Sequence, residues 1–290
     1  VNPSRGLGDV YKRQILGDAK VSLQLLKALS TNYKVSSGYI SKYTAAKEKW
    51  LKDLEKITAP SLMNSLPSDS QVIGAVNRSV PENTIVIGAA GSMPGELHKL
   101  WKVLDQNTYH MEYGYSCMGY EISAGIGVNL ATPNRPNVVF SGDGSYLMMN
   151  SELATAAMMG ISMTLILTNN KGYGCINRLQ KATGGAEFNN LFSDSKFDKQ
   201  IEIDFVSHAK SMGAKAVYVS EIAELEVEVK NTIRKKGVKV IVIDTDPNIS
   251  TVEGGAWWDV AIPETFTDSN KSNLRKDYLV ARINQNKGFK

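Results

Sequence analysis

The central part of the chain alternates short apolar runs with amphipathic stretches of helical period. The apolar runs that predict buried strands are residues 84–88, 138–140, 163–167, 215–219 and 238–243. The stretches that predict helices are residues 71–80, 96–104, 118–130, 151–159, 204–212 and 221–235. Because strand–helix–strand crossovers are right-handed, this order predicts an α/β fold: a three-layer, open parallel sheet of about five or six strands with helices on both faces.

The pattern divides the chain into segments. Residues 1–14 carry no periodicity, resemble translated adapter sequence, and are set aside as a non-native leader. Residues 15–58 contain two helical stretches around a polar linker at 32–42, and we expect the end of a central domain there. The sheet domain is expected at residues 59–260, followed by a polar tail with one helix at 261–290.

Local signals add two loops and one helix cap to this pattern. Residues 107–117 are rich in aromatic side chains and are expected to be irregular. Residues 171–199 contain four glycines and no clear period, so they predict a long loop, which inside a compact domain is usually functional. Asp69 is expected to cap the helix at 71–80.

Polar side chains stand at the ends of two consecutive apolar runs. Gly142-Asp143-Gly144-Ser145 ends the first run, and Asn169-Asn170 ends the second. We expect Asp143 and Asn170 side by side at the carboxyl ends of parallel strands, where open α/β sheets bind ligands. A carboxylate and a carboxamide supply the oxygen ligands that Mg²⁺ prefers, and glycines let the backbone approach a phosphate. The unit predicts a magnesium–diphosphate site.

Composition and charge narrow the classes of function. Hydrophobic content of 42% and charged content of 21% are ordinary for a globular protein, and no apolar run approaches the length of a membrane span. Residues 1–57 carry 11 Lys and Arg against 5 Asp and Glu, whereas the remaining chain carries 22 against 24. This peripheral excess does not indicate nucleic-acid binding. Two cysteines make no disulfide framework, and a cytoplasmic setting is expected.

The pairing of Gly-Asp-Gly with Asn-Asn resembles the cofactor signature of thiamine-diphosphate enzymes. The resemblance covers residues 62–260 and implies thiamine diphosphate and Mg²⁺ as cofactors. It assigns the metal to Asp143, Asn170 and the backbone carbonyl of Gly172. The residues that it assigns to the diphosphate are Gly91, Ser92, Gly142, Gly144 and Ser145.

The segment Ser116-Cys117-Met118-Gly119 resembles the part of the family that lies beneath the cofactor rings. Met118 matches the apolar residue that wedges between the rings, and the Ser116 carbonyl matches an acceptor for the amino group, although the family more often has glycine there. The resemblance also implies a glutamate from a separate, N-terminal pyrimidine-binding domain, which we expect to lie outside these 290 residues. Glu112 and Glu121 flank the segment, but we interpret them as surface or structural carboxylates.

A narrower resemblance concerns the reaction. Four stretches are similar to family members that hydrolyse a carbon–carbon bond of a polyol cyclic 1,2-diketone in inositol catabolism: 109–121, 142–152, 172–177 and 254–260. The candidates for proton transfer are His110 and Tyr173, with a structural role for His110 as an equal alternative, and Tyr173 and Asn177 are expected near the substrate hydroxyls.

Two other functions stay open from the sequence. One is a different reaction on the same cofactor, by an acetolactate-synthase-like carboligase or a 2-keto-acid decarboxylase. The other is a non-catalytic phosphate- or nucleotide-binding module. The resemblance further implies a homodimer or higher homo-oligomer, because family sites form between subunits, and it implies that the 290-residue chain alone is inactive.

Overall fold

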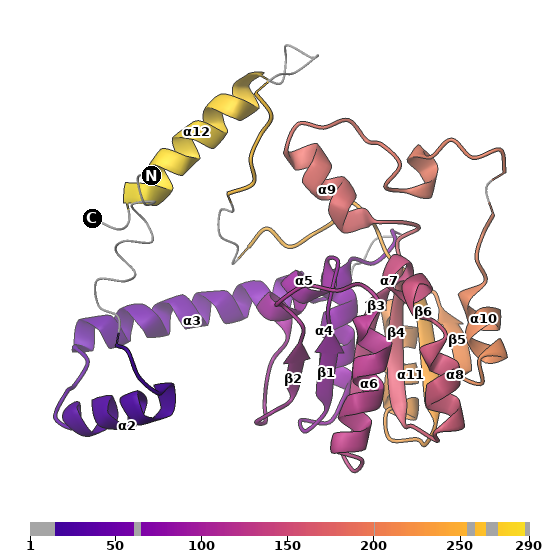
Figure 1. Ribbon diagram of the computed structural model, residues 1–290, viewed down its shortest axis with the longest axis horizontal. Helices are drawn as coiled ribbons and strands as arrows, with labels where there is room; N and C mark the ends of the chain where they lie inside the picture. The colour runs from indigo at the N-terminus through magenta and orange to yellow at the C-terminus, as the bar shows by residue number, and fades with distance from the viewer. Residues whose placement is uncertain (1–14, 61–64, 200, 254–258, 265–271, 288–290) are drawn as a thin grey trace. The chain divides into compact units, whose positions relative to one another are not determined.

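Six parallel strands form one sheet in the order β2-β1-β3-β4-β6-β5 (Figure 1). The strands are β1 (Ile85–Gly88), β2 (Tyr109–Met111), β3 (Asn137–Gly142), β4 (Met163–Asn169), β5 (Lys215–Val219) and β6 (Val238–Asp244). The computed structural model describes residues 15–60, 65–199, 201–253, 259–264 and 272–287. The predicted fold class, an open parallel sheet with helices on both faces, is confirmed.

Helices cover both faces of the sheet. The helices that pack together on one face, with α6 and α8 in front of the sheet in Figure 1, are α6 (Tyr120–Ala131), α8 (Glu152–Met158) and α10 (Phe205–Ser211). The helices that pack together on the opposite face are α4 (Asp69–Ser79), α5 (Met93–Leu100) and α11 (Ile222–Thr232). Alternate strand residues point to opposite faces, and because both faces are covered, the central strands β3, β4 and β6 are mainly apolar and buried along almost their whole length.

The strand order places a switch point between β1 and β3. From β1 the chain moves outward to β2 and then crosses back to β3 on the other side of β1. The adjacent β3 and β4 pair with Gly142 opposite Thr168, so the residues that follow them, Asp143 and Asn170, emerge together. Ligands of open α/β sheets bind at such points; Asp143, at the end of β3, flanks this one, and Asn170 follows the neighbouring strand β4.

The described residues fall into two compact units. The first, Lys52–Gly255, contains the sheet. The second contains α2 (Ala19–Leu29), most of α3 (Ser37–Ile57), and α12 (Ser272–Lys287). The domain boundaries after residues 58 and 260 stay predictions, and the leader at 1–14 lies outside the described residues.

In the second unit, each end segment has its own local contacts. The Asp18 side chain accepts a hydrogen bond from Val21 N at 2.9 Å and caps α2. In the tail, Tyr278 donates to Asp259 at 2.7 Å, and Arg275 pairs with Glu264 at 2.8 Å. The predicted tail helix is present; the sequence indicates it near residues 275–284, and it extends beyond them at both ends, while α3 begins inside the predicted linker.

The structure corrects the local signals read from the sequence. The predicted loop at 171–199 contains helix α9 (Gly174–Ala182), and the stretch expected to be irregular contains β2. The cap of α4 is Ser68, which forms a capping box with Gln71, and not Asp69. Asp69 is the first residue inside the helix, and its buried carboxylate accepts a hydrogen bond from Ser92 instead.

Gly125 and Gly127 of α6 offer a matched test of this packing. A Cβ atom at Gly125 would lie 2.8 Å from Val139 Cγ2 and 2.9 Å from Met163 Sδ, whereas one at Gly127 would meet nothing within 4 Å. Gly125→Ala is therefore expected to lower the free energy of unfolding by about 1–2 kcal/mol. Gly127→Ala is expected to raise it by up to about 1 kcal/mol, through helix propensity alone. Urea denaturation measures both, and equal effects would contradict close contact of α6 with the sheet.

Candidate functional site

A cavity of about 270 Å³ lies at the carboxyl end of β1, β3 and β4. Its lining comes from the turn after β1, the segment before α6, the turn after β3 and the loop after β4. The residues are Ala90, Gly91, Ser92, Met93, Ser116, Met118, Gly142, Asp143, Gly144, Ser145, Thr168, Asn170, Gly172, Tyr173, Gly174, Cys175 and Ile176. The structure therefore brings together all the residues predicted to bind metal or cofactor, and Tyr173 with them.

A larger cavity, of about 840 Å³, lies beside this one and shares Asn170 with it. Its walls come mainly from the segment 191–203 and from residues that follow β6. It contains none of the glycines of the two predicted turns. We place the candidate site in the smaller cavity, because Asp143 and the predicted glycines line it, whereas of the predicted metal- and cofactor-binding residues only Asn170 lines the larger one.

Asp143 and Asn170 each present an unused oxygen. Both side chains are buried, at 3% and 9% exposure. Among the described residues, neither Asp143 Oδ1 nor Asn170 Oδ1 has a hydrogen-bond partner. Buried polar atoms without partners lower the stability of the fold. Two such oxygen atoms on residues that line one cavity therefore indicate a site for a group that binds oxygen atoms, such as a cation.

The second carboxylate oxygen of Asp143 fixes its orientation. Gly172 N donates to Asp143 Oδ2 at 2.8 Å, which ties the turn after β3 to the loop after β4. Burial raises the pKa of Asp143 to about 6, against the lowering effect of hydrogen bonds from backbone N–H groups such as that of Gly172. A bound cation would favour the ionised form of Asp143. Binding of a cation near or below pH 6 would therefore release a proton from this carboxyl.

Glycines bring the backbone to the cavity at two positions where a side chain does not fit. Gly172 has a φ of +149°, and a Cβ atom there would lie 2.4 Å from Asn190 O. A Cβ atom at Gly144 would lie 2.6 Å from the ring of Tyr173. Tyr173 thus packs against the Gly-Asp-Gly turn, and any larger residue at either glycine would displace a wall of the cavity.

Glu121 joins three walls of the cavity, a role that the sequence did not reveal. Its carboxylate is 1% exposed and accepts hydrogen bonds from Ser145 Oγ at 2.9 Å, Gly119 N at 2.9 Å and Ala90 N at 3.3 Å. Burial raises its pKa despite these donors. Glu121 is structural, as predicted, and not a surface residue. The Ser145 hydroxyl donates to Glu121, and this hydrogen bond stabilises the turn after β3.

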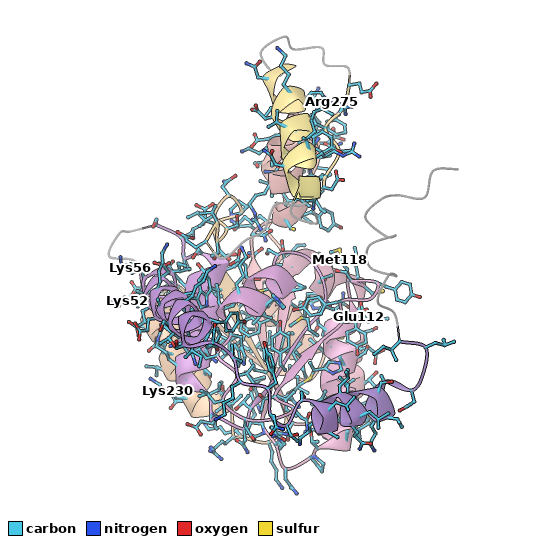
Figure 2. The ribbon with its side chains drawn as sticks, turned by 90° about the vertical axis from the view of Figure 1, so that its left-hand side faces the viewer. Lys52, Lys56, Glu112, Met118, Lys230 and Arg275 are labelled. Carbon is cyan, nitrogen blue, oxygen red and sulfur yellow. The ribbon has the colours of Figure 1, made fainter. Side chains whose placement is uncertain are left out.

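The segment before α6 is held in a strained backbone conformation. Ser116 has a φ of +51°, and Glu112 accepts hydrogen bonds from Tyr115 N at 2.8 Å and Cys117 N at 2.9 Å. These bonds keep the pKa of the Glu112 carboxyl below its usual value. Figure 2 labels Glu112 and Met118, which flank the segment; Met118 also lines the cavity. The loop thus presents Met118 to the cavity while Glu112 stabilises its shape.

The two candidates for proton transfer occupy different places. Tyr173 lines the cavity and is 42% exposed. His110 is not among the described lining residues: its Nε2 lies 2.8 Å from the Tyr120 hydroxyl, and its ring stacks on that tyrosine. A catalytic role for either residue stays a prediction. The contacts of His110 with Tyr120 fit the alternative interpretation given above, in which His110 has a structural role.

Asp69 is a second carboxylate that the sequence did not connect with the site. Ser92, which lines the cavity, donates to Asp69 Oδ2 at 2.6 Å. Asp69 is 2% exposed, and burial raises its pKa. No signal in the sequence could reveal this contact, since it depends on how α4 and α5 pack together.

The donor set is suited to a hard divalent cation that keeps other ligands of its own. Within the described ranges, no group of three or more His, Cys, Asp or Glu side chains is placed to hold a metal. One carboxylate oxygen, one carboxamide oxygen and nearby backbone instead suit a cation whose remaining ligands are phosphate oxygens and water. No helix among the described residues is long and apolar enough to cross a membrane.

This sheet edge and its cavity define a cofactor-binding domain. Residues 89–243 match the family described as thiamine pyrophosphate enzyme, C-terminal TPP binding domain, and the chain belongs to that family. Solved structures share the fold, including a thiamine diphosphate-dependent 4-hydroxybenzoylformate decarboxylase of Rhodococcus jostii. That structure has a TM-score of 0.56 and 21% identity over 65% of this chain and 34% of its own.

Curated relatives are more similar in sequence. The 3D-(3,5/4)-trihydroxycyclohexane-1,2-dione hydrolase of Clostridium tetani is 35% identical over 91% of this chain and 45% of its own length. The protein of the same name from Geobacillus thermodenitrificans is 34% identical over 88% of this chain and 44% of its own. The chain thus spans about half the length of the curated relatives it matches. Of the stretches used for the narrower resemblance, residues 254–258 lie outside the described part of the structure.

The raised pKa of Asp143 makes a prediction about stability without metal. Between its ordinary value of 3.8 and about 6, the folded chain binds more protons than the unfolded chain, so stability falls as pH rises through this window. Asp143→Asn should therefore raise the free energy of unfolding at pH 7 in chelator, by about 1–3 kcal/mol.

The gain should shrink as the pH is lowered from 7 to 4, and urea denaturation at each pH measures it. Asp204→Asn is the control, because Asp204 is exposed and hydrogen bonds from Ser207 lower its pKa. That variant should gain no stability at pH 7. A gain for Asp143→Asn that is independent of pH would contradict the burial argument.

Proposed function

We propose that this chain supplies the metal–diphosphate half of a thiamine-diphosphate site in an enzyme that hydrolyses a carbon–carbon bond of a cyclic 1,2-diketone. The observation that carries the proposal is the pair of buried, unpartnered oxygens of Asp143 and Asn170 at the ends of adjacent strands. The family match supports the cofactor, and the names of the relatives support the reaction.

In this proposal Mg²⁺ binds Asp143, Asn170 and the carbonyl of Gly172. The carboxylate supplies one negative charge, which suits a cation whose charge is further neutralised by the diphosphate. The turn at Gly91 and Ser92 and the turn at Gly142 and Gly144 supply backbone N–H groups to the phosphates. Gly91, with a φ of +79°, keeps the first turn free of a side chain at this approach.

The rings of the cofactor would occupy the part of the cavity next to Ser116 and Met118. Met118 is an adaptable apolar side chain that can fill a gap between two rings, and the Ser116 carbonyl is a hydrogen-bond acceptor. When bound, thiamine diphosphate supplies an electron sink for the bond that breaks. Tyr173, exposed at the cavity and packed against Gly144, is placed to orient a polyol substrate or hold a proton on its hydroxyl.

We further propose that the remaining half of the site comes from outside this chain. The relatives are about twice as long as the part that matches, and the family takes a glutamate from a pyrimidine-binding domain, usually of a partner subunit. Glu121 is committed to three hydrogen bonds and Glu112 to a loop, so neither is free for this role. The functional form would therefore be a homodimer or higher homo-oligomer of the full-length protein.

The metal ligands can be tested by binding. In the full-length protein, Asp143→Ala and Asn170→Ala should each weaken Mg²⁺-dependent binding of thiamine diphosphate, on the order of 100-fold, because each removes one of the few protein ligands. Asn231→Ala, an exposed residue of α11, is the control and should bind normally. Calorimetry with Mg²⁺ and with chelator gives both values. Binding that ignores Mg²⁺ and both variants would favour a phosphate-binding module instead.

The reaction can be tested with substrates. The full-length protein, loaded with Mg²⁺ and thiamine diphosphate, should open trihydroxycyclohexane-1,2-dione to an open-chain acid, and it should not release carbon dioxide from pyruvate. Product analysis after incubation with each compound measures this. Turnover of pyruvate alone would identify a decarboxylase or carboligase. The 290-residue chain by itself should show no turnover if, as we propose, the remaining half of the cofactor site comes from outside it.

A further inference from the structure

Ser92 stands at the N-cap of α5 but does not cap it. Serine at this position usually accepts a hydrogen bond from a backbone N–H of the first turn, and the described residues show no such bond here. The hydroxyl instead donates to Asp69 Oδ2 at 2.6 Å. A serine has one proton to donate, so in this state Ser92 offers only lone pairs to a ligand in the cavity that it lines.

Asp69 stands behind this hydroxyl, out of contact with solvent. Its second oxygen, Oδ1, has no hydrogen-bond partner among the described residues. Burial is the largest influence on Asp69 and raises its pKa; Ser92, Arg178 and Thr245 act in the opposite direction, while Glu96 adds to the rise. An ionised carboxylate here is thus poorly compensated.

Besides Thr245, which follows β6, the other groups that face Asp69 come from two helices. Glu96 belongs to α5, and Arg178 and the Cys175 thiol belong to α9. Arg178 is engaged with the carbonyl of Pro247 at 2.5 Å. Helix α11 packs on α4 as well, but its Glu226 pairs with Arg78 near the other end of that helix. Arg178 is therefore the one cation named among the described neighbours of Asp69, and Glu96 opposes it.

We propose that Asp69 is a positioning residue that carries a proton when thiamine diphosphate is bound. In that state the Asp69 carboxyl donates to Ser92 Oγ, and Ser92 turns its own proton to a phosphate oxygen. The only chemical change is the transfer of one proton from solvent to the Asp69 carboxylate. That proton stays on Asp69 for as long as the complex exists. The inference rests on the proposed function, which places the diphosphate in this cavity.

Electrostatics decides between the two directions of this hydrogen bond. A phosphate oxygen that met a hydroxyl already donating to an ionised carboxylate would face lone pairs, with a second negative charge close behind it. Protonation of Asp69 removes that charge and converts Ser92 from an acceptor to a donor. Hydrogen bonds to charged oxygens are among the stronger ones, which favours the reversed direction once the anion is present.

The experiment uses the full-length protein with Mg²⁺ and thiamine diphosphate. Infrared difference spectra between wild type and Asp69→Asn report whether the complex contains a protonated carboxyl at residue 69. Calorimetry over a range of pH reports affinity. Asparagine does not titrate, yet its amide can donate to Ser92 as the protonated acid would. Glu96→Gln is the control, since Glu96 is a buried carboxylate nearby that accepts from Thr251 N and touches no cavity hydroxyl.

The complex of the wild-type protein should show the carbonyl band of a protonated carboxyl, which Asp69→Asn removes and Glu96→Gln retains. Asp69→Asn should bind within about threefold of wild type at pH 6, and its relative affinity should not fall as pH rises, because it cannot ionise. Ser92→Ala should weaken binding about tenfold or more, through loss of the donor.

Two results would overturn the role of Asp69. One is a wild-type complex without the band, and the other is Asp69→Asn weakening binding as much as Ser92→Ala does. A folded wild-type protein that does not bind Mg²⁺ and thiamine diphosphate at all would instead overturn the proposed function. The two failures are therefore distinguishable in the same set of measurements.

Discussion

The walls of the cavity come from distant parts of the chain, and the buried carboxylate of Glu121 holds three of them together. It accepts from Ala90 in the turn after β1, from Gly119 in the segment before α6, and from Ser145 in the turn after β3. At 1% exposure almost no solvent competes with these donors, and hydrogen bonds in such a low-dielectric interior are stronger than in water. The spacing between the turn after β1, the turn after β3 and the segment before α6 depends on the Glu121 side chain.

The same cavity carries groups that the fold alone does not satisfy. Asp143 and Asn170 keep unpartnered oxygens, Asp69 keeps a third, and burial raises the pKa of both acids. Such groups lower the stability of the ligand-free chain, and they persist because the surrounding strands fix them. A cation and an anion bound together would supply the missing partners. The cation would bind the oxygens of Asp143 and Asn170, and the Ser92 hydroxyl would turn toward the anion. The candidate site is therefore one of the places, together with buried atoms such as Thr164 Oγ1, where polar groups among the described residues are left without partners.

Local pattern was sufficient to predict the sheet and the placement of Asp143 and Asn170 at one edge of it. The apolar runs that became β3 and β4 are buried and short, and Asp143 and Asn170 follow them directly, so a crossover rule was enough to bring them together. The contacts of Glu121 and Asp69 were missed because their partners lie 24 and 23 positions away. The cap was assigned to Asp69 although the capping-box partner of Ser68, Gln71, lies only three positions away and was readable from the sequence. Strand β2 was missed because its three residues are only half-buried at an edge and give no period.

Different segments around the cavity would affect the cofactor and the reaction differently. Solved structures near 20% identity share the fold and are named as decarboxylases, whereas the relatives near 35% are named as hydrolases. Under the proposed function, a metal–diphosphate anchor on the strand ends would suit either kind of reaction, because it would hold the end of the cofactor at which no bond to the substrate changes. Discrimination would then come from the segments proposed to face the rings. In this chain those would be the Ser116–Met118 segment, held by Glu112, and the loop with Tyr173 packed on Gly144.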